Sequence, residues 1–195
     1  MFAKRSREYR GTPQIQRVGS AMCADAGMLS MIGGMPVQTP YTPDLAGRDP
    51  LDAMQETPDR IRRLTGGWSA AQFDRSYAPG KWTARQILIH LAQTELALGA
   101  RARMALSTPD YAAQPFDQNK WIARDTGLSG PDALGALLAI SGMNRILFRS
   151  LSPQDREIPF SHPEYGALTI DWLVHQMAGH QIHHLRQLEQ IAAAG

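Results

Sequence analysis

The sequence predicts an all-α protein, specifically a four-helix bundle preceded by an N-terminal extension. Three observations support this fold class. Apolar residues recur at helical spacing in four segments that follow residue 50. These segments begin at residue types that favour helix starts and end before proline or a polar loop. No run alternates convincingly between apolar and polar residues, as a half-buried strand would.

The first helix is expected to begin near Pro50, because proline favours the first turn of a helix and here follows Asp49. Its apolar stripe consists of Leu51, Met54, Ile61 and Leu64. Pro58 lacks a backbone donor and is expected to kink or restart the helix, with Thr57 as a fresh cap. A short turn over residues 69–75 should follow, before Pro79 and Gly80 break the chain direction.

The second helix has the clearest start signal in the sequence. Thr83 and Gln86 have the spacing of a capping box, in which each side chain bonds the other residue's backbone N–H. The stripe that follows consists of Ile87, Leu91, Thr94, Leu98 and Ala105, and the helix should run to about Leu106. Residues 107–128 then form a long loop, and loops of that length are often functional.

The third helix should run from Pro131 to about Leu151, where Ser152 and Pro153 stop it. A polar loop that includes His162–Gly166 leads to the fourth helix, expected over residues 169–193 with Asp171 in its first turn. Four helices with no convincing strand favour a bundle, and the long second connection allows the helices to pack out of chain order.

The first 50 residues differ in composition from the rest. Residues 1–50 carry six basic and four acidic residues, so residues 51–195 carry fourteen of each and are formally neutral. We expect residues 1–50 to be a poorly ordered extension, or a segment that precedes a true start at a downstream Met such as Met35, because they offer little periodic apolar content. Residues 51–195 are the expected bundle domain.

Composition narrows the function further. The chain of 195 residues has a net charge of +2, which belongs to the extension, so a nucleic-acid partner is not expected. No apolar run approaches the roughly 18 residues that a membrane span needs, and we expect a cytoplasmic protein. The single cysteine, Cys23, excludes an internal disulfide framework and a cysteine-rich zinc site.

The histidines carry the clearest chemical information. Projected at 100° per residue, His180 and His184 fall within the apolar stripe of the fourth helix, whereas His175 falls on the opposite face and His183 to one side. His90 lies on the same side of the second helix as Ile87 and Thr94, and so can face this pair across the core. Three histidines with an open fourth position are the form of a catalytic zinc-type site.

Two familiar site types are disfavoured by the neighbouring residues. A zincin peptidase needs Glu directly after its first histidine, and here that position is Gln181, which cannot take a proton at neutral pH. A di-iron bundle needs Glu three residues before its histidines, and Met177 and Gln181 stand there. A mononuclear site therefore remains.

At this point the sequence resembles the DinB-like metalloproteins, in particular the YfiT-type branch described as bacillithiol S-transferases and formerly as metal-dependent hydrolases. The resemblance covers about residues 51–193 and rests on ordered blocks: Pro79-Gly80-Lys81-Trp82-Thr83, Arg85-Gln86-Ile87, His90-Leu91, Phe116-Asp117, Trp121, Leu151-Ser152-Pro153, His162-Pro163-Glu164-Tyr165-Gly166, Thr169 and the segment from His180 to His184.

The resemblance implies a homodimeric four-helix bundle that holds one divalent metal ion per chain, zinc or nickel. Matched block by block, its ligands are His90, His180 and His184, and His183 matches a position that is often His in this branch but is not a ligand. No catalytic residue beyond the metal ligands is assigned.

We expect the metal to activate a thiol, since an open coordination position can lower the pKa of a bound thiol. With no cysteine in the bundle, the sulfur must come from a low-molecular-weight thiol such as bacillithiol, which is joined to an electrophilic small molecule. Trp121, Tyr165 and Phe116 are candidates to line the mouth of the site, or simply to cover the bundle end; His162 is expected to structure its loop. A metal-dependent hydrolase that activates water and a non-enzymatic metal-binding bundle remain as alternatives.

Overall fold

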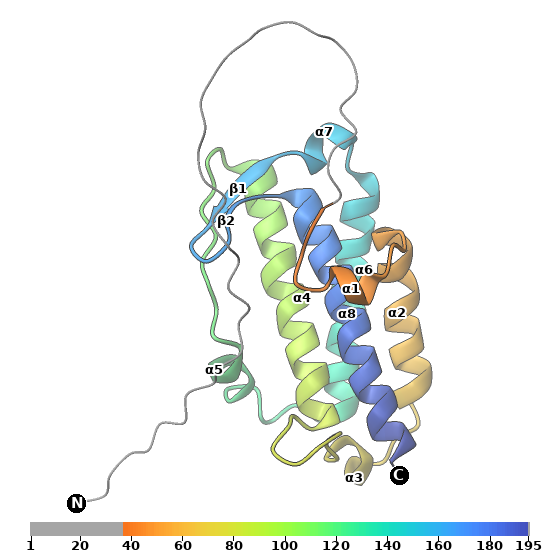
Figure 1. Ribbon diagram of the computed structural model, residues 1–195. Coiled ribbons are helices and arrows are strands. Elements are labelled where there is room, and N and C mark those ends of the chain that lie inside the picture. Colours follow the sequence, from red (N-terminus) through yellow and green to blue (C-terminus); the bar gives the residue numbers. More distant parts are fainter. Residues whose placement is uncertain (1–36, 195) are drawn as a thin grey trace, which may run out of the picture. The chain divides into compact units, whose positions relative to one another are not determined.

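The computed structural model describes residues 37–194, and four long helices dominate this part of the chain (Figure 1). They are α2 (Pro50–Thr65), α4 (Ala84–Ser107), α6 (Gly130–Ser150) and α8 (Ile170–Ala193). In the bundle α2 packs against α6 and α8, and α4 packs against the same two helices. The helices α2 and α4, which follow each other among the four long helices, therefore lie diagonally across the bundle. The long helices thus pack out of chain order.

The helix starts follow from their capping residues. Thr83 accepts a hydrogen bond from the backbone N–H of Gln86, whose side chain bonds back, so the predicted capping box before α4 is confirmed. Ser129 and Asp132 form the same motif before α6. Thr169 caps α8 by accepting from the backbone N–H of Trp172. Each cap satisfies backbone donors that the first helical turn leaves without partners.

The helix α2 continues through Pro58, so the predicted restart at this residue is wrong and Thr57 is not a cap. Thr57 and Pro58 are both buried within the helix, on the side that also buries Met54 and Ile61. A proline inside a helix costs roughly 3 kcal/mol, which the packing of this buried face must offset.

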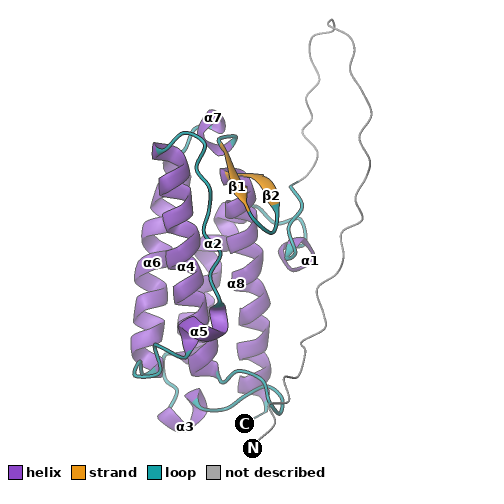
Figure 2. Cartoon of the chain, turned by 90° about the vertical axis from the view of Figure 1, so that its left-hand side faces the viewer, coloured by secondary structure: helices purple, strands orange, loops and turns teal. Residues whose placement is uncertain are grey.

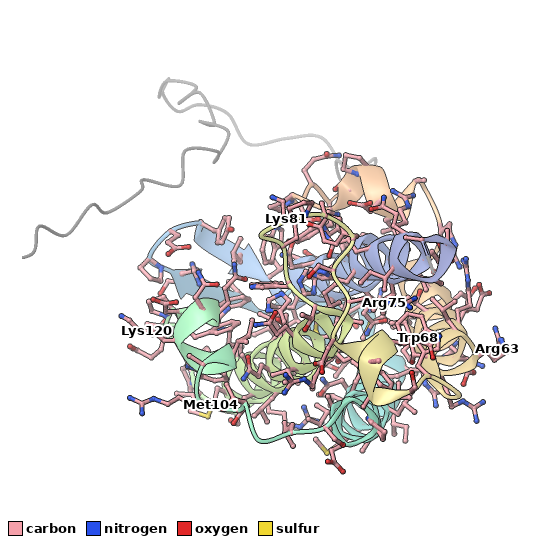
Figure 3. The ribbon with its side chains drawn as sticks, turned by 90° about the horizontal axis from the view of Figure 1, so that it is seen from below. Arg63, Trp68, Arg75, Lys81, Met104 and Lys120 are labelled. Atoms are coloured by element: carbon pink, nitrogen blue, oxygen red, sulfur yellow. The ribbon has the colours of Figure 1, made fainter. Side chains whose placement is uncertain are left out.

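The connections between the long helices contain five short elements. The predicted turn after α2 is the helix α3 (Ala70–Phe73), and the long loop before α6 includes α5 (Gln118–Ile122). Figure 3 looks at the bundle from the end where α3 and Trp68 lie, and shows Lys120 of α5 on the outside. After α7 (Pro153–Arg156), the strands β1 (Pro159–His162) and β2 (Gly166–Thr169) form an antiparallel hairpin beside the bundle (Figure 2).

The sequence predicted a polar loop around His162–Gly166, and the structure shows a β-hairpin in this segment instead. Its four paired positions run from Pro159 with Thr169 to His162 with Gly166. Gly166 has a positive φ of 74°, a conformation that glycine adopts without strain, and it follows the turn. Each strand has four residues, which is the lower limit of the length over which alternation can be recognised in a sequence.

Part of the predicted extension is packed on the bundle. The helix α1 (Thr42–Leu45) contacts α8, and Leu45 is buried in the core. The Trp172 indole Nε1 donates to the backbone oxygen of Gln38, and Arg186 bonds Asp44. The structured part therefore includes residues 37–49. The expectation of disorder for residues 1–36, together with Cys23 and Met35, lies outside the described residues.

The core is apolar along the bundle. One cluster includes Phe148, Leu173 and Met177, and the other includes Ile87, Leu91 and Leu137. Among the described helices, none has the length and the apolar character that crossing a membrane would require.

Candidate metal centre

Three imidazole rings converge between α4 and α8. The Nε2 atom of His180 lies 2.9 Å from Nε2 of His90 and 3.1 Å from Nε2 of His184. All three side chains are buried, and their candidate ligand atoms lie within 4.8 Å of one another. Within residues 37–194, no further His, Cys, Asp or Glu joins this group.

Helix geometry explains the convergence. His180 and His184 are four residues apart on α8, so their rings lie on one face, with centroids 4.5 Å apart. His90 comes from α4, which packs directly against α8. The structure thus brings together the three histidines that the sequence analysis selected.

The nitrogen atoms cannot all be paired with one another by hydrogen bonds. Nδ1 of His184 lies 2.7 Å from the side-chain oxygen of Gln187 and must donate to it, which leaves a lone pair on Nε2 of this neutral ring. Nε2 of His180 faces two nitrogen atoms at once and carries at most one hydrogen, so only one of these contacts is a good hydrogen bond.

A divalent cation fits this arrangement. Two nitrogen atoms bound at about 2.0–2.1 Å to a tetrahedral zinc ion stand about 3.3 Å apart. The contacts of 2.9 and 3.1 Å are close to that separation, and three lone pairs directed at one point are what a cation needs. The donor set of three imidazoles suits zinc and nickel alike.

The electrostatic environment keeps the rings neutral. Burial, with a smaller contribution from His183, lowers the pKa of His90 to about 4. Burial and the neighbouring His90 lower the pKa of His184 to about 3. For His180, burial and both partner histidines lower the pKa well below its ordinary value. Neutral imidazole is the form that binds metals, so these residues are prepared for ligation near neutral pH.

The remaining histidines have other partners. His183 lies 3.4 Å from a carboxylate oxygen of Asp44 and accepts a hydrogen bond from the Gln187 side chain. His175 contacts the backbone oxygen and carboxylate of Asp171. His162 accepts from the backbone N–H of Glu164, so it structures the hairpin turn, and it also lines the pocket described below.

The segment before α2 forms one wall of the centre. The Tyr41 ring lies 5.0 Å from the His180 ring, edge to face, and 5.3 Å from the His183 ring. Asp44 holds this segment to α8 through His183 and Arg186. The Trp82 ring lies 4.8 Å from the His90 ring and 6.3 Å from the His184 ring. Each of the three histidines therefore has an aromatic ring of Tyr41 or Trp82 beside it.

A pocket of about 180 Å³ leads to the centre. His90 and His180 form part of its lining, so a small molecule that enters it meets two of the three histidines. The polar side chains around it include Thr94 and Gln176, whose buried oxygen atoms have no hydrogen-bond partner within the described residues. The other lining groups are Tyr41, Leu98, Arg101, Pro115, Phe116, Gln118, Phe160, His162, Glu164, Tyr165, Leu168, Trp172 and Leu173.

The three aromatic residues predicted for the site mouth are placed differently from one another. Phe116 and Tyr165 line the pocket. The Trp121 ring lies 4.8 Å from the Phe116 ring, at an interplanar angle of 46°, and does not line the pocket itself.

A second buried polar group lies behind the histidines. Glu95 of α4 accepts hydrogen bonds from Gln181 of α8 at 2.6 Å and from Asn144 of α6 at 2.8 Å. Burial raises the pKa of Glu95 to about 6, although hydrogen bonds from Asn144, Gln181 and Ser141 act in the opposite direction. Gln181, which excluded a zincin motif, is thus a link between three helices.

Several residues around the pocket and the histidines were not identified from the sequence. Arg101 lies eleven residues after His90, which is nearly a whole number of helical turns, so projection of the second helix had the means to find it. Tyr41 directly precedes the four-residue helix α1 and Asp44 lies in it; this helix is too short to show periodicity, and nothing in the sequence indicated its position. Gln187 follows His184 by three residues, a spacing that allows contact on a helix.

Comparison with known proteins gives consistent matches. The family model described as the DinB superfamily matches residues 53–188. A relative from Oceanobacillus iheyensis, named as a candidate metal-dependent hydrolase, is 28% identical over 142 residues, which are 72% of this chain and 83% of that protein. The Bacillus subtilis protein YfiT, named in the same way, is 25% identical over 145 residues, with 73% and 82% of the two chains covered.

Solved structures match the fold. The structure of YfiT from Bacillus subtilis, described as having an unusual four-helix bundle topology, matches with a TM-score of 0.69 and 23% identity, over 74% of this chain and 85% of that one. A mycothiol-dependent maleylpyruvate isomerase matches with a TM-score of 0.60 and 17% identity, over 71% and 59% of the chains.

Proposed function

Because this chain belongs to the DinB superfamily, we propose that it is a metal-dependent transferase that joins a low-molecular-weight thiol to an electrophilic small molecule. One observation carries the proposal: three buried histidines, with no fourth protein ligand within the described residues, stand at a pocket that can admit a small molecule. Structural zinc sites are normally closed by four protein ligands, whereas catalytic sites keep a position open.

His90, His180 and His184 would hold the metal through their Nε2 atoms. A divalent cation held there would act as a Lewis acid and would lower the pKa of a thiol bound at its open coordination position. Gln187 keeps the lone pair of His184 directed at the centre by accepting the Nδ1 hydrogen. The rings of Tyr41 and Trp82 limit the access of water to the histidines.

The choice of a thiol rests on two supports. No cysteine occurs in residues 37–194, so the bundle has no sulfur nucleophile of its own. One protein that shares the fold is named as mycothiol-dependent, which makes a small-molecule thiol a reasonable cosubstrate here. In the proposed reaction the thiol sulfur bonds the electrophilic carbon, the leaving group departs with its electron pair, and the thiol proton passes to solvent.

Hydrolysis is the second candidate, since the relatives are named as candidate metal-dependent hydrolases. In that reaction water takes the place of the thiol. Glu164 and Glu95 are two carboxylates to consider as a general base. Glu164 lines the pocket from its exposed rim, and Glu95 is bound to Asn144 and Gln181 behind the histidines. Neither contacts the three histidines, and this favours the transferase.

The test uses purified protein loaded with zinc or nickel, monobromobimane as the electrophile and a set of small thiols. We expect fluorescent thioether to form faster than in the uncatalysed reaction, and the excess rate to vanish in His180→Ala. Conjugation no faster than the background would remove the transferase proposal. Bromide release at the same rate without any thiol would favour hydrolysis instead.

A further inference from the structure

A buried arginine lines the pocket and is not explained by the metal centre. Arg101 of α4 has a relative exposure of 9%, low for a side chain that is always charged. Within the described residues it forms no ion pair, and its one hydrogen bond runs from Nη2 to the backbone oxygen of Gln114. Its guanidinium also lies 5.8 Å from the centre of the Phe116 ring.

A buried charge without a partner is costly, and burial accordingly lowers the pKa of Arg101. Four of the five N–H donors of the guanidinium are not used by hydrogen bonds within residues 37–194. The fork of donors matches the two oxygen atoms of a carboxylate, and charge-assisted pairs of this kind are about twice as strong as neutral ones. The hydroxyl of Thr94, which has no partner within the described residues and can donate a hydrogen bond, lies in the same pocket.

One carboxylate is already near. Glu164 lines the pocket and acts electrostatically on Arg101, but it is exposed and no ion pair joins the two residues. Water screens an exposed carboxylate, so Glu164 offsets the charge of Arg101 only in part. The pocket therefore keeps a site for an anion.

We propose that Arg101 is the anchor of an anion subsite, which binds a carboxylate of the thiol or of the electrophile while the other end of that molecule reacts at the histidines. This inference rests on the proposed function only for the statement that the other end of the ligand reacts at the histidines. His90 and Arg101 are eleven residues apart on α4, which corresponds to about 16 Å between their backbones along the helix axis. Both side chains reach into the same pocket, so the ligand spans only the part of this distance that the two side chains leave. It still needs several bonds between its carboxylate and its reacting atom.

Two matched pairs of compounds distinguish the sources of the carboxylate. The thiol pair is 6-mercaptohexanoate and 6-mercaptohexanol, each with neutral monobromobimane. The electrophile pair is 4-(bromomethyl)benzoate and 4-(bromomethyl)benzamide, each with neutral 2-mercaptoethanol. In every case sulfur bonds carbon, the carbon–bromine bond breaks, bromide leaves with the electron pair and the thiol proton goes to solvent.

The measurement is the ratio of kcat/KM for the acid to that for its neutral analogue, in metal-loaded protein. We expect a ratio of at least about 10 in one of the two pairs for the wild type, a fall toward 1 in Arg101→Gln and an intermediate ratio in Arg101→Lys. Arg124→Gln, which removes the same charge from an exposed position outside the pocket, should keep the wild-type ratio. A wild-type ratio near 1 in both pairs, or a high ratio that survives in Arg101→Gln, would overturn the inference.

Binding without turnover separates this inference from the proposed function. Calorimetric titration with hexanoate and with hexanamide should show tighter binding of the acid to the wild type and to Arg124→Gln, but not to Arg101→Gln. If no pair reacts and hexanoate still binds through Arg101, the transferase proposal fails and the subsite stands. If hexanoate binds the wild type no better than hexanamide, the subsite inference is wrong even where catalysis is found. This outcome is measured on the wild type alone, so it can still be tested if Arg101→Gln does not fold.

Discussion

The backbone of Tyr41 lies directly against Gly179, because a Cβ atom at position 179 would stand 2.5 Å from the Tyr41 carbonyl oxygen. Gly179 directly precedes His180, so this contact places the Tyr41 ring beside the candidate metal ligand His180. Glycine inside a helix usually costs about 1 kcal/mol relative to alanine. Here the cost is offset because only glycine lets residues 37–45 approach α8 so closely.

Replacing this glycine should reverse the usual effect of alanine in a helix. Gly179→Ala is expected to lower the free energy of unfolding by about 1–3 kcal/mol, since the clash is with backbone atoms that cannot turn away. Gly135→Ala is the matched control in α6, because a Cβ atom there meets nothing within 4 Å, and it should raise the stability. Urea denaturation of both variants measures the difference, and a stabilised Gly179→Ala would contradict the close approach.

Gln187 should matter for metal affinity although it is not a ligand. It accepts the Nδ1 hydrogen of His184 at 2.7 Å and so fixes the orientation of that ring. Loss of such a partner typically weakens metal binding about 10- to 100-fold, and we expect this for Gln187→Ala. Gln190→Ala, an exposed neighbour on the same helix, should bind zinc as the wild type does in a competition with a chromogenic chelator. Equal affinities in the two variants would show that the contact does not orient His184.

Ionisation of Glu95 should make the folded protein less stable as the pH rises. The pKa of this carboxyl is raised from 4.5 to about 6, so the folded state holds a proton that the unfolded state releases between these values. The stabilising contribution is fully present below pH 4.5 and is lost as the pH rises through 6, by about 2 kcal/mol in total.

The measurement compares Glu95→Gln with the wild type in urea at several pH values from 4.5 to 7.5. Groups common to both proteins cancel in the difference of their unfolding free energies. This difference should shift in favour of the variant as the pH rises, whatever its absolute value. A difference that does not change with pH would show that Glu95 titrates normally in the folded protein.

Much of the bundle was predictable because the residues that determine each helix lie close together in the sequence. The capping box of Thr83 and Gln86 and the spacing of His180 and His184 need only the geometry of one helix. His90 was placed by projection on a second helix. The starts of the four long helices, and the ends of α4, α6 and α8, lie within one residue of their predicted positions.

The rest depends on contacts between distant segments. The helix α2 continues past Pro58 because the face of the helix that contains Pro58 is buried in the bundle. The residues near Pro58 in the sequence do not show this burial. The short strands around His162 form because they pair with each other, not because of a pattern in either one. Tyr41 reaches His180 only because Gly179 allows the approach, and this requires two segments more than 130 residues apart.

The central claim is that His90, His180 and His184 hold one divalent metal ion, and metal analysis of purified variants tests it most directly. We predict about one zinc or nickel ion per chain in the wild type and in His175→Ala, whose side chain contacts Asp171 instead. His90→Ala, His180→Ala and His184→Ala should each lose the ion while keeping the helical circular dichroism of the wild type. A full complement of metal in folded His180→Ala would contradict the account.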